Sequence, residues 1–225
     1  MDTQPLKVTF TIKSNSPIRE PMHLIHLDAL LAWSRVQQAV EENDSRGFEV
    51  QHDLPLERLT SKDGHWVFAA SALHYAPFMR ELRYWSRKTD LGMLASDRED
   101  GLLALRANKI STSSGPWKQA SQFEPLLHIA KAEAWCIGNK EAIETLLERV
   151  KFIGKRRSRG YGETTKISVE YDNSANEKVN ARVFSWQRTP QHIEMECGTK
   201  PPYWKVGMGF YPTKQYLRQI FANNS

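Results

Sequence analysis

The residues best suited to chemistry lie in a basic loop that is rich in glycine. Residues 151–161 read KFIGKRRSRGY, with five cationic side chains and no acid, and Gly162 follows closely. Glycine permits positive φ angles and close approach of backbone N–H groups to an anion, while arginine offers a planar fork that suits phosphate. The pattern predicts a loop that binds the RNA backbone, with a solvated basic turn as the alternative. The candidate contacts are Gly154, Lys155, Arg156, Arg157, Arg159, Gly160, Tyr161 and Gly162.

A second set of cations and aromatic rings is found in residues 78–125, which lack a sustained core periodicity. Pieces such as RYWSRKTD and ANKISTSSGPWKQ interleave the two residue types. Single-stranded nucleic acid favours this combination, because each stacked base contributes about 1–3 kcal/mol. The alternative is that these rings anchor an inserted arm to the rest of the protein. The candidate RNA contacts here are Arg83, Trp85, Arg87, Lys88, Lys109, Ser114, Trp117 and Lys118.

Catalytic chemistry has weaker support in the sequence. His23 and His26 lie three residues apart, and a neutral imidazole there could deprotonate a ribose 2′-OH. No acid or cation cluster accompanies them, so packing at a helix entry is the alternative. The motifs of metal sites, P-loops and serine or cysteine nucleophiles are absent, and Cys136 and Cys197 are interpreted as reduced thiols. We therefore expect no metal, no cofactor and no enzymatic activity.

The elements that would position these residues follow from hydrophobic periodicity. Alternation predicts strands, and spacings of three or four predict helices. Asp28 falls in the first turn of one helix, where the dipole favours a carboxylate, and Asn139 is a suitable N-cap for another that Gly154 would end. Strands are expected at 6–12, 66–75, 126–137 and 166–171, and helices at 24–40, 139–150 and 216–221.

This βαββαβ order predicts an α+β domain of the ferredoxin-like (RRM-like) type. The domain would span residues 1–171, with the arm inserted at about 78–125 and the glycine loop at 154–162. Residues 172–225 would form a C-terminal extension. The alternative is an irregular α+β domain.

Composition and charge limit the class of protein. The 225 residues are 40% hydrophobic and 25% charged, with no apolar run near the ~20 residues of a membrane span and no secretory signal. We expect a cytoplasmic protein without a membrane partner. The net charge is +5, but residues 1–77 carry −3 and residues 78–225 carry +8. A polyanionic partner for the later part of the chain is consistent with this asymmetry.

Three stretches carry a resemblance to a known family. The segment GKRRSRGYGE between a predicted helix and strand resembles the RAMP superfamily of CRISPR-associated RNA-binding proteins. PMHLIHLDALLAW and NKISTSSGPWKQ narrow the resemblance to the "Cas five" type, 5′-handle-capping subunit of type IV CRISPR effector complexes. The similarity covers about residues 5–171.

The resemblance implies a non-catalytic subunit of a ribonucleoprotein for antiviral or anti-plasmid defence. The subunit would bind the repeat-derived 5′ handle of the guide RNA (crRNA) and cap the filament of backbone subunits, next to the large subunit. Target DNA is a further candidate partner. The main alternative is a metal-independent, repeat-specific endoribonuclease that matures crRNA with His23 or His26 as base. A free-standing RRM-type RNA binder and a purely structural interaction protein are the others.

Overall fold

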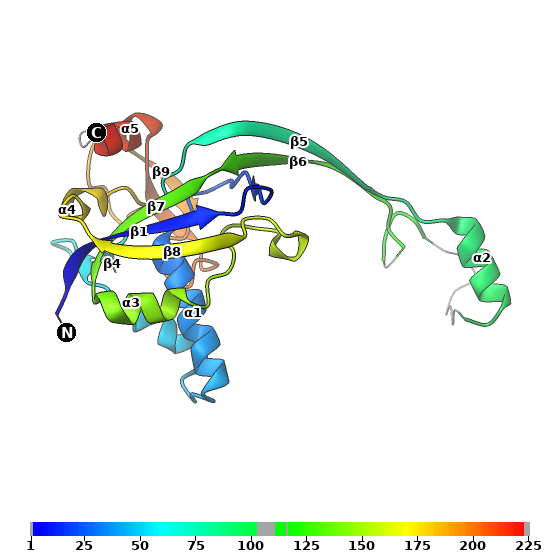
Figure 1. The fold of residues 1–225 in the computed structure, drawn as a ribbon, viewed down its shortest axis with the longest axis horizontal. Coiled ribbons are helices and arrows are strands. Elements are labelled where there is room, and N and C mark those ends of the chain that lie inside the picture. The colour runs from blue at the N-terminus through cyan, green and yellow to red at the C-terminus, as the bar shows by residue number, and fades with distance from the viewer. Residues whose placement is uncertain (1, 103–110, 116, 223–225) are drawn as a thin grey trace. The chain divides into compact units, whose positions relative to one another are not determined.

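The computed structural model describes residues 2–102, 111–115 and 117–222 (Figure 1). The chain divides into two compact units, the larger of Met1–Met79 and Leu127–Ser225 and the smaller of Arg80–Leu126. The larger unit contains a mixed core of strands and helices. The smaller unit consists of the outer parts of two strands and one helix.

A three-stranded antiparallel sheet forms the centre of the larger unit. Strand β1 (Gln4–Ile12) lies between β7 (Lys131–Gly138) and β8 (Thr164–Tyr171). Val8 stands opposite Ala134 on one side and Val169 on the other. The alternation predicted for 6–12 and 166–171 is confirmed, since Leu6, Val8 and Phe10 of β1 are completely buried.

Two helices pack on the buried face of this sheet (Figure 1). Helix α1 (Leu27–Glu41) contacts α3 (Lys140–Leu147), where the Ser34 hydroxyl donates to the carbonyl oxygen of Leu146 at 2.5 Å. Both predicted helices are confirmed, and the Asn139 side chain caps α3 by accepting from the backbone N–H of Ala142 at 2.9 Å. Because α3 already ends at Leu147, Gly154 does not terminate it.

The strand predicted at 66–75 is only partly regular. A short 3-10 helix at Gly47–His52 precedes β3 (Arg58–Thr60) in the chain. Strand β3 pairs with β4 (Trp66–Phe68). Residues 69–74 then run beside β7 through isolated antiparallel bridges, and the N–H of His74 donates to the carbonyl of Glu133 at 2.7 Å. The segment occupies the next position in the sheet without a continuous ladder.

The strand predicted at 126–137 proves to be two strands. Strand β6 (Ala120–Ile129) ends before the exposed Ala130, and β7 begins at the next residue. The apolar run continues through both strands, so periodicity alone gave no sign of the break. In a second sheet, β6 lies between β2 (Ile18–Arg19) and β5 (Pro77–Arg87).

Residues expected to form an irregular arm contain regular structure. Strands β5 and β6 run side by side, and α2 (Leu91–Glu99) follows β5 (Figure 1). Every side chain of β5 is exposed or half-buried, with no alternation between two faces. A strand without a buried face has no period-two hydrophobic pattern, which is why the sequence did not reveal it.

The C-terminal extension packs against the larger unit. The predicted helix at 216–221 is confirmed as α5, and the Phe221 ring lies 5.3 Å from the Trp135 ring on β7. The Trp135 indole N–H also donates to Asp172 at 2.9 Å. The elements of the extension are α4 (Ala175–Lys178), β9 (His192–Cys197), β10 (Gly207–Pro212) and α5 (Lys214–Ala222).

A fully buried arginine joins this extension to the core. The Arg182 guanidinium lies 3.2 Å from Asp28 and donates to the carbonyls of Phe68, Ala70 and Thr199 at 2.6, 3.0 and 2.7 Å. Asp28 also accepts from the Tyr203 hydroxyl at 2.8 Å. Asp28 was interpreted from the sequence as a helix-dipole residue, but it is one half of a buried ion pair with 0% exposure on both sides.

Replacing Arg182 with methionine is expected to cost about 3–5 kcal/mol of stability, because Asp28 would remain as an unpaired buried charge. The double variant Asp28→Leu/Arg182→Met removes both charges. It should therefore be less destabilised than the sum of the two single variants. Urea unfolding of the four proteins measures this coupling. A coupling energy near zero would show that the two charges do not act as a pair.

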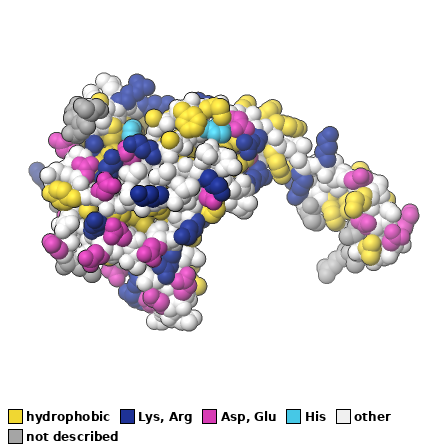
Figure 2. Space-filling model, in the orientation of Figure 1, with side chains coloured by type: hydrophobic (Ala, Val, Ile, Leu, Met, Phe, Trp, Pro, Cys, Tyr) yellow, Lys and Arg dark blue, Asp and Glu magenta, His cyan; other side chains and the backbone are white. Residues whose placement is uncertain are grey.

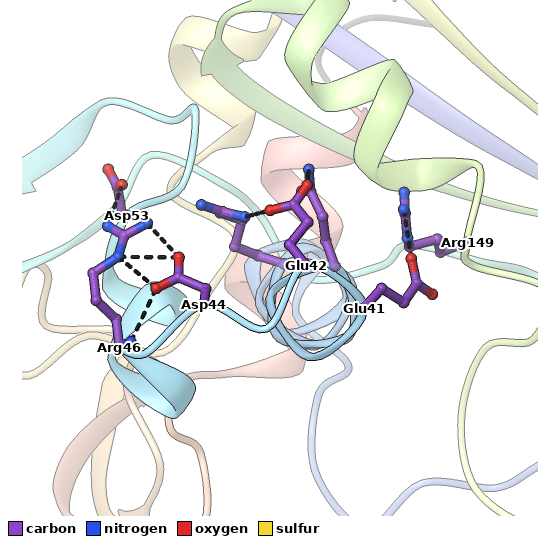
Figure 3. Close-up of polar contacts among 8 residues, drawn as sticks. Glu41, Glu42, Asp44, Arg46, Asp53 and Arg149 are labelled. Carbon is purple, nitrogen blue, oxygen red and sulfur yellow. Dashed lines mark hydrogen bonds and ion pairs between the residues drawn. The ribbon is translucent and has the colours of Figure 1, made fainter.

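The C-terminal end of α1 carries a network of surface charges (Figure 3). Arg46 donates to both carboxylate oxygens of Asp44 at 2.8–3.2 Å and lies 3.5 Å from Asp53. Arg149, just beyond α3, donates to Glu41 at 2.9 Å. The hydrogen bonds from Arg46 lower the pKa of Asp44 to about 2.

An NMR titration of the Asp44 carboxyl group is expected to give a midpoint near pH 2. In Arg46→Ala the midpoint should rise towards the ordinary value of about 3.9. A lowered folded-state pKa contributes stability above the unfolded-state pKa, and this contribution is lost as the pH falls through the folded-state value. Arg149→Ala, which breaks a different pair, should leave the Asp44 titration unchanged. An unchanged midpoint in Arg46→Ala would contradict the assignment.

Candidate nucleic-acid interface

The glycine loop makes a series of tight turns. The φ angles of Gly154, Gly160 and Gly162 are +81°, +75° and +71°, and Arg156 adopts +64°. A short 3-10 turn at Arg157–Arg159 separates the two halves. Positive φ is strained for a residue with a side chain, so the conformation of Arg156 has to be imposed by its surroundings.

Hydrogen bonds to the segment after β1 fix the C-terminal end of this loop. The Ser16 hydroxyl donates to the carbonyl of Gly160 at 2.5 Å and accepts from the N–H of Glu163 at 2.7 Å. The N–H of Gly162 donates to the carbonyl of Pro17 at 3.1 Å. A Cβ at Gly162 would lie 2.0 Å from the carbonyl oxygen of Ile153, so both φ and close packing require glycine there.

The cations of the loop differ in their surroundings. Lys155, Arg156 and Arg157 are exposed and Arg159 is half-buried. The Arg157 guanidinium lies over the Trp33 ring of α1, 4.9 Å from its centroid. Cation–π contacts of this kind contribute about 0.5–1 kcal/mol at exposed sites, so Arg157 is oriented without being removed from solvent.

Tyr161 does not lie on the surface of the loop. Its side chain is 5% exposed and belongs to the buried hydrophobic residues. A buried ring cannot stack on a base in this conformation. Tyr161 therefore anchors the loop, although the sequence suggested a direct RNA contact.

Gly160→Ala and Gly162→Ala distinguish the two reasons for glycine in the loop, which are the positive φ angle and the lack of space for a Cβ. At Gly160 a Cβ would meet nothing within 4 Å, so only the backbone conformation is penalised, by about 1–2 kcal/mol. Gly162→Ala should cost clearly more, because its Cβ would also clash with the carbonyl of Ile153. Chemical denaturation measures both. Equal losses would show that the loop moves to relieve the contact.

In the smaller unit, three of the predicted residues share one pocket. Arg87, Lys88 and Trp117 line a pocket of about 370 Å³ beside the start of α2. The Arg87 Nε donates to the carbonyl of Lys118 at 2.8 Å, and the Thr89 hydroxyl donates to the carbonyl of Trp117 at 2.8 Å. These bonds hold the ends of β5 and the segment before β6 together.

The other arm residues are placed separately. Arg83 pairs with Glu81 at 2.8 Å, and Trp85 is half-buried on β5. The exposed Ser114 hydroxyl lies 3.1 Å from that of Ser111. Lys109 lies outside the described residues. The structure therefore groups only part of the predicted arm site.

The two histidines occupy different environments. His23 is exposed, whereas His26 is 4% exposed and stacks on the Tyr203 ring with centroids 5.2 Å apart. Burial, with a further contribution from Arg182, lowers the pKa of His26 well below its ordinary value. The imidazole of His26 is therefore neutral near pH 7 and enclosed by protein.

The visible surface does not carry a single-sign patch. Figure 2 shows Lys and Arg side chains interspersed with Asp and Glu over the larger unit. Across residues 2–102, 111–115 and 117–222, no group of three His, Cys, Asp or Glu side chains is arranged as a metal site. No helix in the described part of the chain is long and apolar enough to cross a bilayer.

Sequence reasoning missed the residues that support the loop. Ser16, Pro17 and Trp33 contact the loop in the structure, and none of them was among the candidate residues. Nothing in the spacing of these residues indicates a contact with a loop more than a hundred positions later. A Ser-Pro pair that breaks a strand was the one local feature that suggested a fixed turn.

Comparison with protein families gives a match over most of the chain. The model of the family described as "CRISPR type IV associated protein Csf3" matches residues 4–210. The chain belongs to the Csf3 family. This membership confirms the resemblance to type IV CRISPR-associated proteins drawn from the three sequence stretches.

More distant comparisons add little to the Csf3 assignment. No curated protein matches the chain. A solved structure, "Cryo-EM structure of the Type III-B Cmr-beta bound to cognate target RNA", contains a chain that matches with a TM-score of 0.38 and 10% identity. The match covers 75% of the Csf3 family chain and 61% of the other, so this chain spans less than two thirds of its length. A similarity at this level does not define a shared fold.

Proposed function

We propose that this Csf3 family protein is a non-catalytic crRNA-binding subunit of a type IV CRISPR effector. It holds the repeat-derived 5′ handle and caps the filament of backbone subunits, next to the large subunit. The observation that carries the proposal is the glycine loop, which is held in place by Ser16 and Pro17 while Lys155, Arg156 and Arg157 remain exposed.

We infer a ferredoxin-like arrangement for the core, which would agree with this assignment. Residues 69–74, β7, β1 and β8 lie side by side in that order, and β1 is antiparallel to both of its neighbours. This matches the order of the second, third, first and fourth strands of a βαββαβ sheet, with the second strand irregular. The glycine loop lies between the second helix and the fourth strand of that arrangement.

The loop is suited to the sugar–phosphate backbone. Hydrogen bonds from the N–H groups of Arg159, Gly160 and Gly162 to carbonyls of the protein hold its turns, and the exposed cations supply the charge. Contacts between these cations and RNA neutralise phosphates and release counterions, which makes RNA affinity strongly dependent on salt. The loop would thus bind the handle mainly by its shape and charge, while base pairing by the guide reads the target.

The pocket of the smaller unit offers a second contact. Trp117 provides an aromatic ring, and Arg87 and Lys88 provide cations beside it. Asp90 and Asp97 also line the pocket and disfavour a phosphate inside it. We therefore assign Trp117 to stacking on an RNA base, and Arg87 and Lys88 to the phosphates of the RNA strand outside the pocket.

The endoribonuclease alternative has less support. A general base must reach the proton that it removes, within hydrogen-bond distance or through one water. His26 is 4% exposed and stacked on Tyr203, and the neighbouring cation, Arg182, is 0% exposed and paired with Asp28, so Arg182 is not available to stabilise a scissile phosphate. His23 is exposed, but no cation pairs with it in the described structure to stabilise a scissile phosphate. Activity on RNA is therefore not part of the proposal.

The variant Lys155→Gln/Arg156→Gly tests the loop. Glycine suits the φ of +64° at position 156, so the fold should be retained while two cations are lost. We expect weaker binding of a 5′-handle RNA. The log–log salt dependence should flatten by up to about 0.7 for each phosphate contact removed. Fluorescence anisotropy at several salt concentrations measures both.

The control Lys62→Gln/Lys214→Gln removes the same charge from other exposed sites of the larger unit. The control variant should leave the slope of log affinity against log salt concentration nearly unchanged. A second control uses an RNA of scrambled handle sequence, which should bind more weakly to the wild-type protein. Unchanged affinity and slope in the loop variant would refute the role of the loop. Cleavage of labelled repeat RNA by the purified chain in EDTA would favour the nuclease.

A further inference from the structure

A pocket of about 260 Å³ lies where the entry to α1 meets the C-terminal extension. One wall comes from His26 and Ala29, and the other from Tyr203, Val206 and Tyr211. All of these residues belong to the larger unit, and none was assigned a role above in binding RNA. No residue of the glycine loop lines the pocket, but Ile25, which does line it, lies beside Gly154, where a Cβ would be 3.7 Å from the Ile25 Cδ1.

Hydrogen bonds hold the two walls in position. The Tyr211 hydroxyl accepts from the N–H of Leu24 at 3.0 Å, and the Tyr203 hydroxyl donates to Asp28 at 2.8 Å. Both bonds connect the extension to the segment that begins α1. Because the walls are fixed before any ligand enters, little conformational entropy would be lost on binding.

One polar atom in this region lacks a partner. The Nδ1 atom of His26 is buried and makes no hydrogen bond within the described part of the chain. A buried polar group without a partner costs about 1–3 kcal/mol, and native proteins rarely leave one without a reason. His26 lines the pocket, so a ligand there could satisfy the imidazole.

The lining contains one carboxylate, the exposed Glu196, and its remaining polar groups are uncharged near neutral pH where burial shifts their pKa values. Burial lowers the pKa of His26 and raises the pKa values of the Cys197 thiol and of the Tyr203 and Tyr211 hydroxyls. All four groups are therefore in their neutral forms. Such a wall disfavours a phosphate or a carboxylate and favours an uncharged, largely apolar ligand that can form a few hydrogen bonds.

The size of the pocket limits the ligand further. Its volume falls just below the range of about 300–1,000 Å³ that holds drug-sized molecules. A single planar heterocycle fits this description, since aromatic side chains offer stacking and an imidazole offers either a donor or an acceptor to its edge. Lys205 is exposed and lies between the lining residues Tyr203 and Val206 in sequence. Its ammonium group could contact the RNA phosphate next to a base held in the pocket.

We infer that this pocket takes one unstacked nucleobase of the bound guide RNA, with the ring edge facing His26. The inference rests on the proposed RNA-binding function and adds a contact that reads a base. The glycine loop would bind the backbone, and the pocket would select the register of the strand. Unstacked bases in protein pockets are the usual means of sequence recognition in single-stranded RNA.

The test combines a filled pocket with a scan of abasic sites along the handle RNA. Val206 is 55% exposed, so Val206→Trp should fill the mouth without disturbing the core. The matched control is Met208→Trp, which adds the same ring at a residue that is 59% exposed and does not line the pocket. Ala29→Leu fills the pocket from α1 and serves as a second, independent variant.

In the wild type and in Met208→Trp, one abasic position should weaken binding by a factor of about 5 to 140, which corresponds to the ~1–3 kcal/mol of one stacked base. In Val206→Trp and Ala29→Leu, the intact RNA should already bind that weakly, and the same abasic site should have no further effect. The Lys155→Gln/Arg156→Gly variant should retain the abasic effect, because the loop acts on phosphates.

Two results would overturn the inference, and they differ in what they imply. If intact RNA binds the filled variants as tightly as the wild type, or the abasic effect persists in them, the pocket does not hold a base, although RNA binding stands. If the wild type binds no handle RNA at all, the proposed function fails and the pocket assignment fails with it.

Discussion

The larger unit depends on one buried guanidinium. Arg182 has no exposure to solvent, so its donors must be satisfied by the protein, and its charge must be matched by Asp28. Its acceptors come from the start of α1, from the segment after β4 and from Thr199 in the extension. These three regions can therefore take only a narrow range of relative positions. The extension is in this sense part of the core. Burial, with a further contribution from the positive charge of Arg182, lowers the pKa of the neighbouring His26 and keeps it neutral.

The glycine loop is also held in one conformation by hydrogen bonds, although it lies at the surface. A loop that binds a flexible strand loses less entropy if its own conformation is already fixed. Here the fixing groups are backbone amides and the hydroxyl of Ser16, which leave the exposed cations to solvent. Arg156 retains a strained φ, a feature that recurs at ligand-binding positions. The buried Tyr161 ring provides the apolar anchor under this arrangement.

Elements with one buried face could be predicted from the sequence, and others could not. The alternation of β1 and the spacing of α3 follow directly from burial on one side. The break at Ala130 could not be seen, because apolar residues continue on both sides of it, and β5 was missed because it buries neither face. The residue types of the candidate site were readable because cations and glycines have few other uses in such a run. The support from Ser16 and the acceptors of Arg182 were not, since they are set by tertiary contacts between distant segments.

The order of the strands along the chain has a consequence for biosynthesis. Strand β1 lies at the centre of its sheet, but its neighbours begin only at Lys131 and Thr164. At about 5–20 residues per second, a ribosome needs on the order of ten seconds to reach the first of them. During that interval the apolar face of β1 has no native strand to pair with, and an unpaired apolar strand is a template for association with other chains. The central strand of the finished sheet is thus open to misassembly while the protein is being made.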